Sequence, residues 1–181
     1  MKMQPLILVA IALGVLAIIF GTLRTSANTA SKGLDRTTVD SLDLDSYLGT
    51  WYEIVRKPHF FEKGMSNVTA TYTLLPDGTI EVVNKGVKNG KPKVSRGKAK
   101  TTDRVGQLKV TFFLFPGEYN IMELGPDYDY SVVGGSNGGY LWILSRTPSL
   151  PQSLLDEIYA RLEMRGYDLS DIIIVDQQQN M

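Results

Sequence analysis

Eight short runs rich in Val, Ile, Thr, Tyr and Phe follow one another along the chain, and residues typical of turns separate them. Runs of this length and composition predict β-strands. Short connections favour an antiparallel up-and-down meander, and eight such strands can close into a barrel that holds one small ligand. A two-sheet sandwich usually needs longer crossovers. We therefore expect a barrel with strands at residues 51–57, 68–75, 79–87, 94–101, 108–113, 119–124, 130–133 and 140–145.

The hydrophobic period changes after the eighth run. Leu154, Leu155, Ile158 and Leu162 fall on one helical face, and Gly166 is a natural helix stop. A short last strand is expected at residues 172–175. The predicted fold class is all-β with one helix: an eight-stranded antiparallel barrel, a C-terminal α-helix packed outside it, a short last strand and an N-terminal apolar helix.

The N-terminus differs in kind from the rest of the chain. An uncharged apolar run at residues 6–23 lies between Lys2 and Arg24, and its length falls between a signal-peptide core and a membrane span. Residues 1–30 are therefore either a signal peptide or an N-terminal membrane anchor, and the remainder is exported across a membrane. The further boundaries that we expect are a linker at 31–42, the barrel domain at 43–176 and a tail at 177–181.

Composition excludes several classes of function. The 19 basic and 19 acidic residues balance and are spread along the chain, so nucleic acid is not an expected partner. The absence of cysteine removes disulfides, thiolate nucleophiles and Cys-linked lipid anchors. His59 is the only histidine, which argues against a His-based triad or a multi-His metal site. We expect no metal site and no cofactor.

Alternate loops of a meander lie at opposite ends, and this parity brings distant residues together. Gly49 and Trp51 begin the first strand, Tyr130 follows a turn at the same end, and Arg146 closes the eighth strand there. An arginine stacked on an indole face is a favourable pair. We expect Gly49, Trp51, Tyr130 and Arg146 to form a structural floor that closes one end of the barrel.

Three segments resemble, in order, the three signature regions of the lipocalin family: Gly49-Thr50-Trp51-Tyr52-Glu53, Tyr128-Asp129-Tyr130 and Leu144-Ser145-Arg146. The loop at 58–64 and the block at 140–148 look specifically like bacterial lipocalin, in the apolipoprotein-D-like branch. The resemblance covers nearly the whole domain and implies a lipocalin calyx.

The resemblance also implies a function. Such a protein would bind, store or transport fatty acids or lysophospholipids in the bacterial cell envelope, and it would not be an enzyme. Relatives in this branch are typically outer-membrane lipoproteins anchored through a lipidated cysteine, and this chain has no cysteine. We therefore expect a protein free in the periplasm or held at the membrane by its N-terminal helix, rather than a Cys-lipidated lipoprotein.

Side chains of successive strand residues alternate between the two faces, which gives an expected lining for the calyx. The predicted ligand-binding residues are Glu53, Val55, Ala70, Tyr72, Val82, Asn84, Ala99, Val110, Phe112, Tyr119, Ile121, Val133 and Trp142. The loops at the mouth carry apolar clusters, and we expect Phe60, Phe61, Met65 and Phe115 to form a lid; the alternative is that they fold back as an upper core. Lys88, Lys91 and Lys93 at the same mouth either attract an anionic head group or are simply solvated.

An inward carboxylate at Glu53 needs hydrogen-bond partners, for which Asn84, Tyr72 and Tyr119 are candidates. A raised pKa would keep this group neutral beside a lipid tail. We interpret Glu53 as a member of a structural network rather than a ligand contact.

Two other function classes compete with a lipid carrier. One is an envelope enzyme that modifies lipids, although no histidine partner for a nucleophilic serine is apparent. The other is an anchored structural or scaffolding protein without a lipid cargo. The expected partners are a lipid ligand, the membrane through the N-terminal segment, and a second copy of the chain in a homodimer.

Overall fold

The structure is a computed structural model that describes residues 33–112 and 114–178. The predicted apolar helix within residues 1–30 lies outside this range. Within the described part, no helix combines the length and apolar character needed to cross a membrane.

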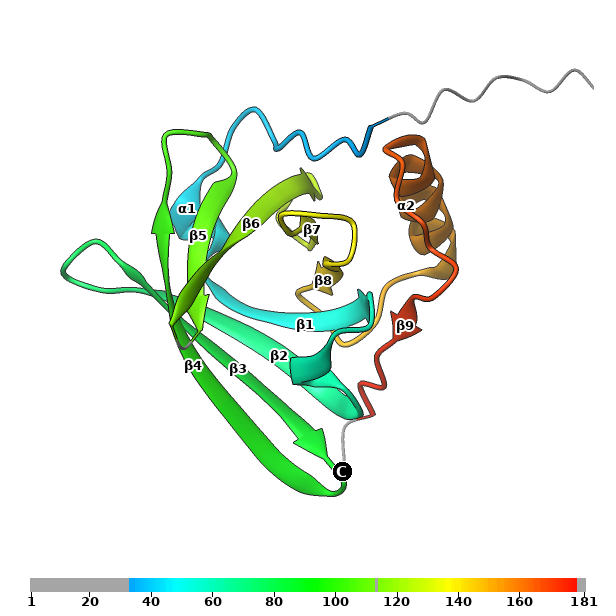
Figure 1. Ribbon diagram of the computed structural model, residues 1–181, viewed down its shortest axis with the longest axis horizontal. Helices are drawn as coiled ribbons and strands as arrows, with labels where there is room; N and C mark the ends of the chain where they lie inside the picture. Colours follow the sequence, from blue (N-terminus) through cyan, green and yellow to red (C-terminus); the bar gives the residue numbers. More distant parts are fainter. Residues whose placement is uncertain (1–32, 113, 179–181) are drawn as a thin grey trace, which may run out of the picture. The chain divides into compact units, whose positions relative to one another are not determined.

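All eight predicted barrel strands are present, in the order shown in Figure 1. They are β1 (Gly49–Arg56), β2 (Met65–Leu74), β3 (Ile80–Lys88), β4 (Lys91–Thr101), β5 (Gln107–Phe112), β6 (Phe115–Leu124), β7 (Tyr130–Gly134) and β8 (Leu141–Ser145). A short helix, α1 (Leu44–Tyr47), precedes β1, and a 3-10 turn, η1 (Phe60–Glu62), lies between β1 and β2. The helix α2 (Gln152–Met164) and a ninth strand, β9 (Ile173–Ile174), follow the barrel.

The first strand closes the barrel. Each strand from β2 to β8 pairs antiparallel with the next, and β1 pairs with β8 on one side and with β2 on the other. Near the end of β1 that is remote from Gly49, β9 pairs with Val55 and Arg56 instead of β2. The structure therefore confirms the predicted eight-stranded antiparallel barrel with a helix after it and a short extra strand outside.

Two separate apolar clusters hold the fold together. The cluster inside the barrel contains Trp51, Ile80, Leu108 and Ile121, all at most 1% exposed. The second cluster lies between the barrel wall and α2. Leu155, Ile158 and Leu162 of α2 are buried there, and full burial of a side chain of this size contributes roughly 1.5–3 kcal/mol. Gly166, with φ of 88°, follows the helix in a left-handed conformation that favours glycine, as predicted.

The expected linker at 31–42 packs against the barrel from residue 34 onward. Val39 donates a backbone hydrogen bond to Ile121, and the Thr38 hydroxyl bonds to the carbonyl of Val105. The Arg36 guanidinium lies 2.7 Å from the Glu118 carboxylate. The polar composition of residues 31–42 did not indicate that this segment packs against the barrel. The segment contributes few apolar side chains and is held largely by hydrogen bonds.

The boundary of the predicted tail is also too early. Gln177 donates from Nε2 to the carbonyls of Glu53 and Val68, each at 2.7 Å. These carbonyls belong to β1 and β2, and they lie beyond the stretch where the two strands pair directly. Gln177 thus bridges the gap where the barrel would otherwise open.

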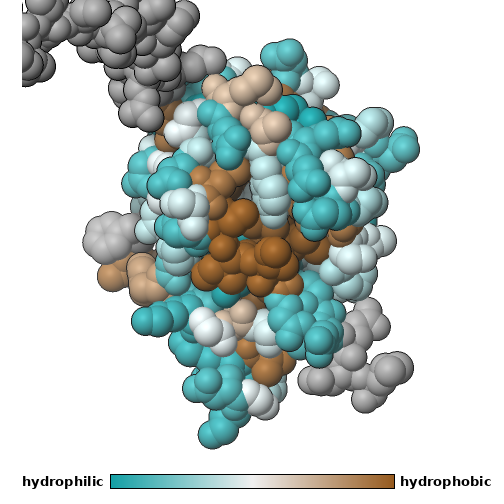
Figure 2. All heavy atoms as spheres, turned by 90° about the vertical axis from the view of Figure 1, so that its right-hand side faces the viewer, coloured by the Kyte–Doolittle hydropathy of each residue, from teal (hydrophilic) through white to brown (hydrophobic). Residues whose placement is uncertain are grey.

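An apolar groove lies on the outside of the barrel, beside α2 and β9. It has a volume of about 460 Å³, and Ile54, Leu150, Leu155 and Ile174 are among the residues that line it. Figure 2 shows apolar surface gathered on this side of the molecule. The expected homodimer stays a prediction.

Candidate functional site

Arg146 closes one end of the barrel. Its guanidinium donates hydrogen bonds to five backbone carbonyls, those of Ser46, Tyr47, Leu48, Thr50 and Tyr128. The guanidinium carbon lies 3.7 Å from the centre of the Trp51 ring, which is fully buried. Burial lowers the pKa of Arg146 from its usual value. The predicted pairing of Arg146 with Trp51 is therefore present, and the five bonds tie α1, the start of β1 and the β6–β7 loop together.

Gly49 and Tyr128 complete this floor. Gly49 has a φ of 91°, which favours glycine, and a Cβ placed there would lie 3.5 Å from the Arg146 guanidinium. The Tyr128 hydroxyl accepts a hydrogen bond from the backbone of Asp43. The Trp51 indole donates to the carbonyl of Tyr47 at 2.9 Å.

Tyr130 was predicted in the floor, and the structure places it elsewhere. Its side chain belongs to the cluster under α2, and its hydroxyl donates to Glu123, which Arg161 of α2 also binds. The reason is alternation, because the neighbouring Ser131 points into the barrel and bonds to Tyr47. Tyr128 supplies the floor contact instead.

Three tyrosine hydroxyls meet in the middle of the barrel. Tyr119 lies 2.7 Å from the Tyr47 hydroxyl and 2.8 Å from the Tyr72 hydroxyl. Burial raises the pKa of Tyr47 to about 12 and raises that of Tyr72 and Tyr119 well above the usual value. The three side chains are therefore neutral at physiological pH and form a polar layer above the floor.

The inward-facing residues change in exposure along the barrel axis. Near the floor they are fully packed: Tyr72, Val82, Ala99, Ile121 and Val133 are at most 4% exposed. Nearer the other end, their inward neighbours keep accessible surface; these partly exposed residues are Ala70, Asn84, Gly97, Val110, Phe112, Tyr119 and Trp142. The inward residues near the floor thus form a filled core, and several of those nearer the other end are only partly buried.

The amide oxygen of Asn84 is buried in the half of the interior away from the floor, which we call the upper half, and no partner for it exists among the described residues. Glycine at position 97 makes room for an aromatic ring, because a Cβ there would lie 2.9 Å from Phe112. Two depressions of the described surface lie outside the barrel.

The predicted inward position of Val55 is wrong. The pairing of β1 with β8 shifts between Glu53 and Val55, which is a β-bulge that adds one residue to β1. Val55 therefore packs in the cluster under α2, and Arg56 turns into the barrel. A bulge cannot be read from simple alternation, and so sequence analysis missed Arg56.

Arg56 is the centre of a buried polar group at the open end. It is 2% exposed, and its Nη1 lies 2.7 Å from the Glu53 carboxylate. Its Nη2 donates to the carbonyls of Glu62 and Met65, which lie at the two ends of the turn that follows η1. Arg56, rather than the expected Asn84, Tyr72 or Tyr119, is thus the partner of Glu53, and it holds the β1–β2 loop in place.

Glu62 extends the group toward the mouth. Its carboxylate lies 2.9 Å from His59 Nε2 and 3.4 Å from the Trp142 indole nitrogen, which donates a hydrogen bond to it. The Nε2 contact lacks hydrogen-bond alignment, and both ring nitrogens of His59 are buried without an aligned partner among the described residues.

The pKa values of the two carboxyls in this group are shifted in opposite directions. Burial and the nearby negative charge of Glu62 raise the pKa of Glu53 well above its usual value, although Arg56 opposes this. Burial also acts to raise the pKa of Glu62, but contact with His59 and Trp142 outweighs burial and lowers it. Glu62 therefore ionises more readily than Glu53.

An aromatic cluster covers this polar group. The rings of His59 and Phe61 stack with centres 3.9 Å apart, and Trp142 and Tyr140 continue the cluster. Phe60 projects outward and is 83% exposed. Met65 packs over Gly86, where a Cβ would lie 2.6 Å from its terminal methyl. Phe115 was expected in a loop and lies in β6 instead, because the β5–β6 turn falls earlier than predicted.

Comparison with known proteins identifies the family. The profile of the family described as "Lipocalin-like domain" matches residues 42–177, which is most of the chain. This chain belongs to the lipocalin family. It is similar to the outer membrane lipoprotein Blc of Escherichia coli K12, with 40% identity over 182 residues that cover 98% of both chains.

Two further lipocalins extend the comparison. Mouse apolipoprotein D is 33% identical over 151 residues, covering 76% of this chain and 78% of the relative. The crystal structure of insecticyanin from the tobacco hornworm has a TM-score of 0.66 at 19% identity, covering 80% of this chain and 85% of that one. Membership of this family supports binding and transport of lipids or other small hydrophobic molecules, which is a role of carriers rather than enzymes.

Proposed function

We propose that this lipocalin carries single-chain lipids, fatty acids or lysophospholipids, in the bacterial cell envelope. The observation that carries the proposal is the change in exposure along the barrel. The inward residues of the upper half are largely apolar, and they keep accessible surface above a closed floor. Burial of apolar surface is the main driving force for binding a lipid tail, and small-molecule sites are concave and mostly apolar.

The groups at the mouth suit the polar end of such a lipid. Arg56 Nε and both nitrogens of His59 are buried, and none has an aligned hydrogen-bond partner among the described residues. An unsatisfied buried donor costs free energy, which a carboxylate or phosphate oxygen would recover. In this arrangement the tail lies between Ala70 and Phe112, and the head group lies beside His59.

The proposed location in the cell envelope is supported by similar proteins. The E. coli and Vibrio cholerae proteins named Blc are outer membrane lipoproteins and share 40% and 43% identity with this chain. The expectation that this protein is not lipidated through cysteine stays a prediction, and mass spectrometry of the mature protein from the membrane fraction tests it.

Titration of delipidated protein with fatty acids and lysophospholipids tests the cargo. Ala70 is inward and partly exposed, so Ala70→Trp fills the upper interior and should lower affinity at least tenfold. Thr71, the next residue of β2, faces outward, and Thr71→Trp is the matched control that should bind normally. Val110→Phe is a milder second filling variant, should Ala70→Trp fail to fold. Normal affinity in both filling variants would refute the proposed location.

A further inference from the structure

Charge is strongly segregated in this protein, contrary to the even spread expected from its zero net charge. Residues 80–112, which form β3, β4 and β5, contain nine Lys or Arg and only two Asp or Glu. This segment has a formal charge of +7, and the rest of the chain therefore carries −7. One part of the barrel wall is strongly cationic.

Five of these cations share the outer face of the sheet. Val82, Ala99 and Leu108 face the interior, so the residues between them point outward. The outward cations are Lys85, Arg96, Lys98, Lys100 and Lys109, and we call this set the basic face.

The basic face has few counter-charges among the described residues. Lys100 lies directly opposite Lys109 in the sheet, an arrangement of like charges that destabilises a strand pair. Arg96 pairs with Glu81, and among the described residues it is the only member of the basic face with an ion-pair partner. Glu118 lies opposite Lys109, but its carboxylate is bound by Arg36. The protein thus accepts a cost that an external anionic surface would remove.

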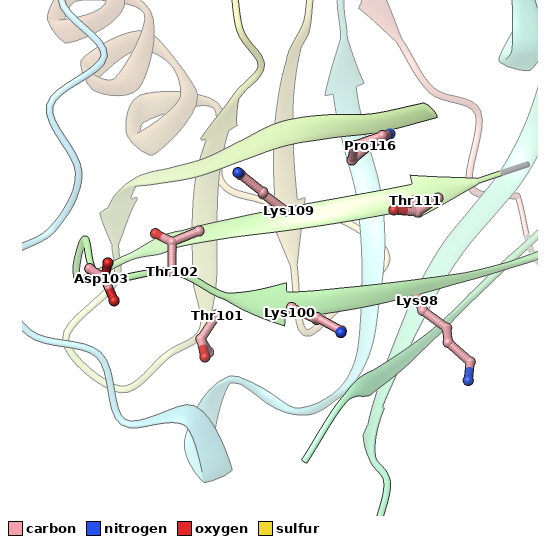
Figure 3. Close-up of a pocket in the computed structure, with 8 residues that line it drawn as sticks. All are labelled: Lys98, Lys100, Thr101, Thr102, Asp103, Lys109, Thr111 and Pro116. Atoms are coloured by element: carbon pink, nitrogen blue, oxygen red, sulfur yellow. The ribbon is translucent and has the colours of Figure 1, made fainter. Parts of the chain in front are cut away.

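The lysines surround a shallow depression of about 510 Å³ between β4, β5 and β6. Figure 3 shows Lys98, Lys100 and Lys109 projecting from the strands, with Thr111 and Pro116 beside them. Asp103, at one end, is the only acidic residue of its lining.

Exposed apolar side chains accompany the cations toward the open end. Val94 is 58% exposed and lies opposite Lys85 on the same face. Leu114, in the turn between β5 and β6, is 82% exposed. Apolar side chains beside Lys and Arg are typical of a surface that lies in a bilayer interface, where the apolar groups enter and the cations bind head groups. A surface for single-stranded nucleic acid would instead offer aromatic rings for base stacking.

We propose that the basic face docks this lipocalin on the surface of an anionic lipid bilayer, with Val94 and Leu114 in contact with the interface. Each Lys or Arg close to an anionic leaflet strengthens binding roughly fivefold. Docking is separate from cargo binding, because the basic face lies on the outside of the barrel wall. It brings the open mouth toward the membrane from which a lipid would be taken.

Sedimentation of the full-length protein with phosphatidylcholine vesicles, with and without phosphatidylglycerol, tests the proposal. The triple variant Lys98→Gln/Lys100→Gln/Lys109→Gln should lose about 100-fold in affinity for anionic vesicles. The matched triple variant with arginine at the same three positions keeps the charge and should bind as wild type does. Raised salt should weaken the wild-type interaction toward that of the glutamine variant.

Several results would overturn docking. They are equal wild-type binding to neutral and anionic vesicles, unchanged binding of the glutamine variant, or binding of duplex DNA in preference to vesicles. Because every protein in the comparison carries the same N-terminal segment, any contribution from that segment cancels. A lipid titration separates the two proposals: the glutamine variant should bind cargo normally, and Ala70→Trp should still dock.

Discussion

Each end of the barrel contains an arginine and a tryptophan, but the two pairs make different contacts. At the floor, Arg146 binds only backbone carbonyls and covers Trp51, which is fully buried. At the mouth, Arg56 pairs with a carboxylate, and Trp142 is only partly buried. Backbone carbonyls do not titrate and are fixed by the fold, whereas carboxylates and exposed rings respond to pH and ligands. The floor is therefore suited to structural support and the mouth to binding.

The largest effect on stability is expected at the mouth. Arg56→Met removes the cation beside Glu53 and the hydrogen bonds to the carbonyls of Glu62 and Met65, and removing one partner of a buried ion pair typically costs about 3–5 kcal/mol. Chemical denaturation at neutral pH measures this loss. A cost below that of the equivalent change at the floor would contradict the contrast between the two ends.

The equivalent change, Arg146→Met, should destabilise the protein by about 1–3 kcal/mol, because it removes hydrogen bonds to neutral carbonyls and the stacking on Trp51. Its affinity for lipid should remain within about twofold of wild type. Unchanged stability together with a large loss of affinity would show that the floor takes part in binding.

A smaller effect concerns pH. The raised pKa of Glu53 means that its contribution to stability is present below the unfolded value near 4.5 and is lost as the pH rises through the folded value. Glu53→Gln removes this loss, so the variant should gain stability relative to wild type as the pH rises from mildly acidic to neutral.

Urea denaturation across this range measures the difference, and Glu81→Gln on the outer surface is the control. Parallel pH profiles for Glu53→Gln and wild type would contradict the assignment. Glu62 has the opposite sign, since its lowered pKa gives stability that is present above about 4.5 and is lost as the pH falls.

The smallest effect on stability is expected for Phe60→Ser. Because Phe60 is 83% exposed, stability should change by less than about 0.5 kcal/mol, whereas lipid affinity should fall several-fold. Leu74→Ser is the matched control, since Leu74 is 44% exposed near the floor. Equal lipid affinity of the two variants would contradict the prediction that Phe60 is part of the lid.

Local patterns predicted the barrel strands and the contact of Arg146 with Trp51, although they misplaced Tyr130. Strand composition, turn residues and parity gave eight strands and brought Arg146 to Trp51, because each signal depends on neighbours in sequence or on counting strands. These patterns failed where a local irregularity shifts the inward and outward alternation of side chains along a strand. The bulge in β1 moved Val55 outward and turned Arg56 inward, and it thereby hid the main cation of the mouth.

Other residues were assigned wrongly or overlooked because their roles depend on tertiary contacts, which no periodic pattern in the sequence indicates. Gln177 was assigned to a tail, although its side chain bridges β1 and β2. His59 and Glu62 lie in a loop, and only the folded chain brings them to Trp142. The lysine-rich segment was visible in the sequence, but the balanced total charge obscured it. A count of charge by segment would have found it.

The two tryptophans of the chain give the most direct test of the central claim, since Trp51 lies in the floor and Trp142 at the mouth. Titration with a brominated fatty acid quenches any tryptophan in contact with it. In Trp51→Phe, which retains only Trp142, we predict strong quenching at saturation. In Trp142→Phe, which retains only Trp51, emission should barely change. Strong quenching of Trp51 with little effect on Trp142 would contradict a supporting floor and a binding mouth.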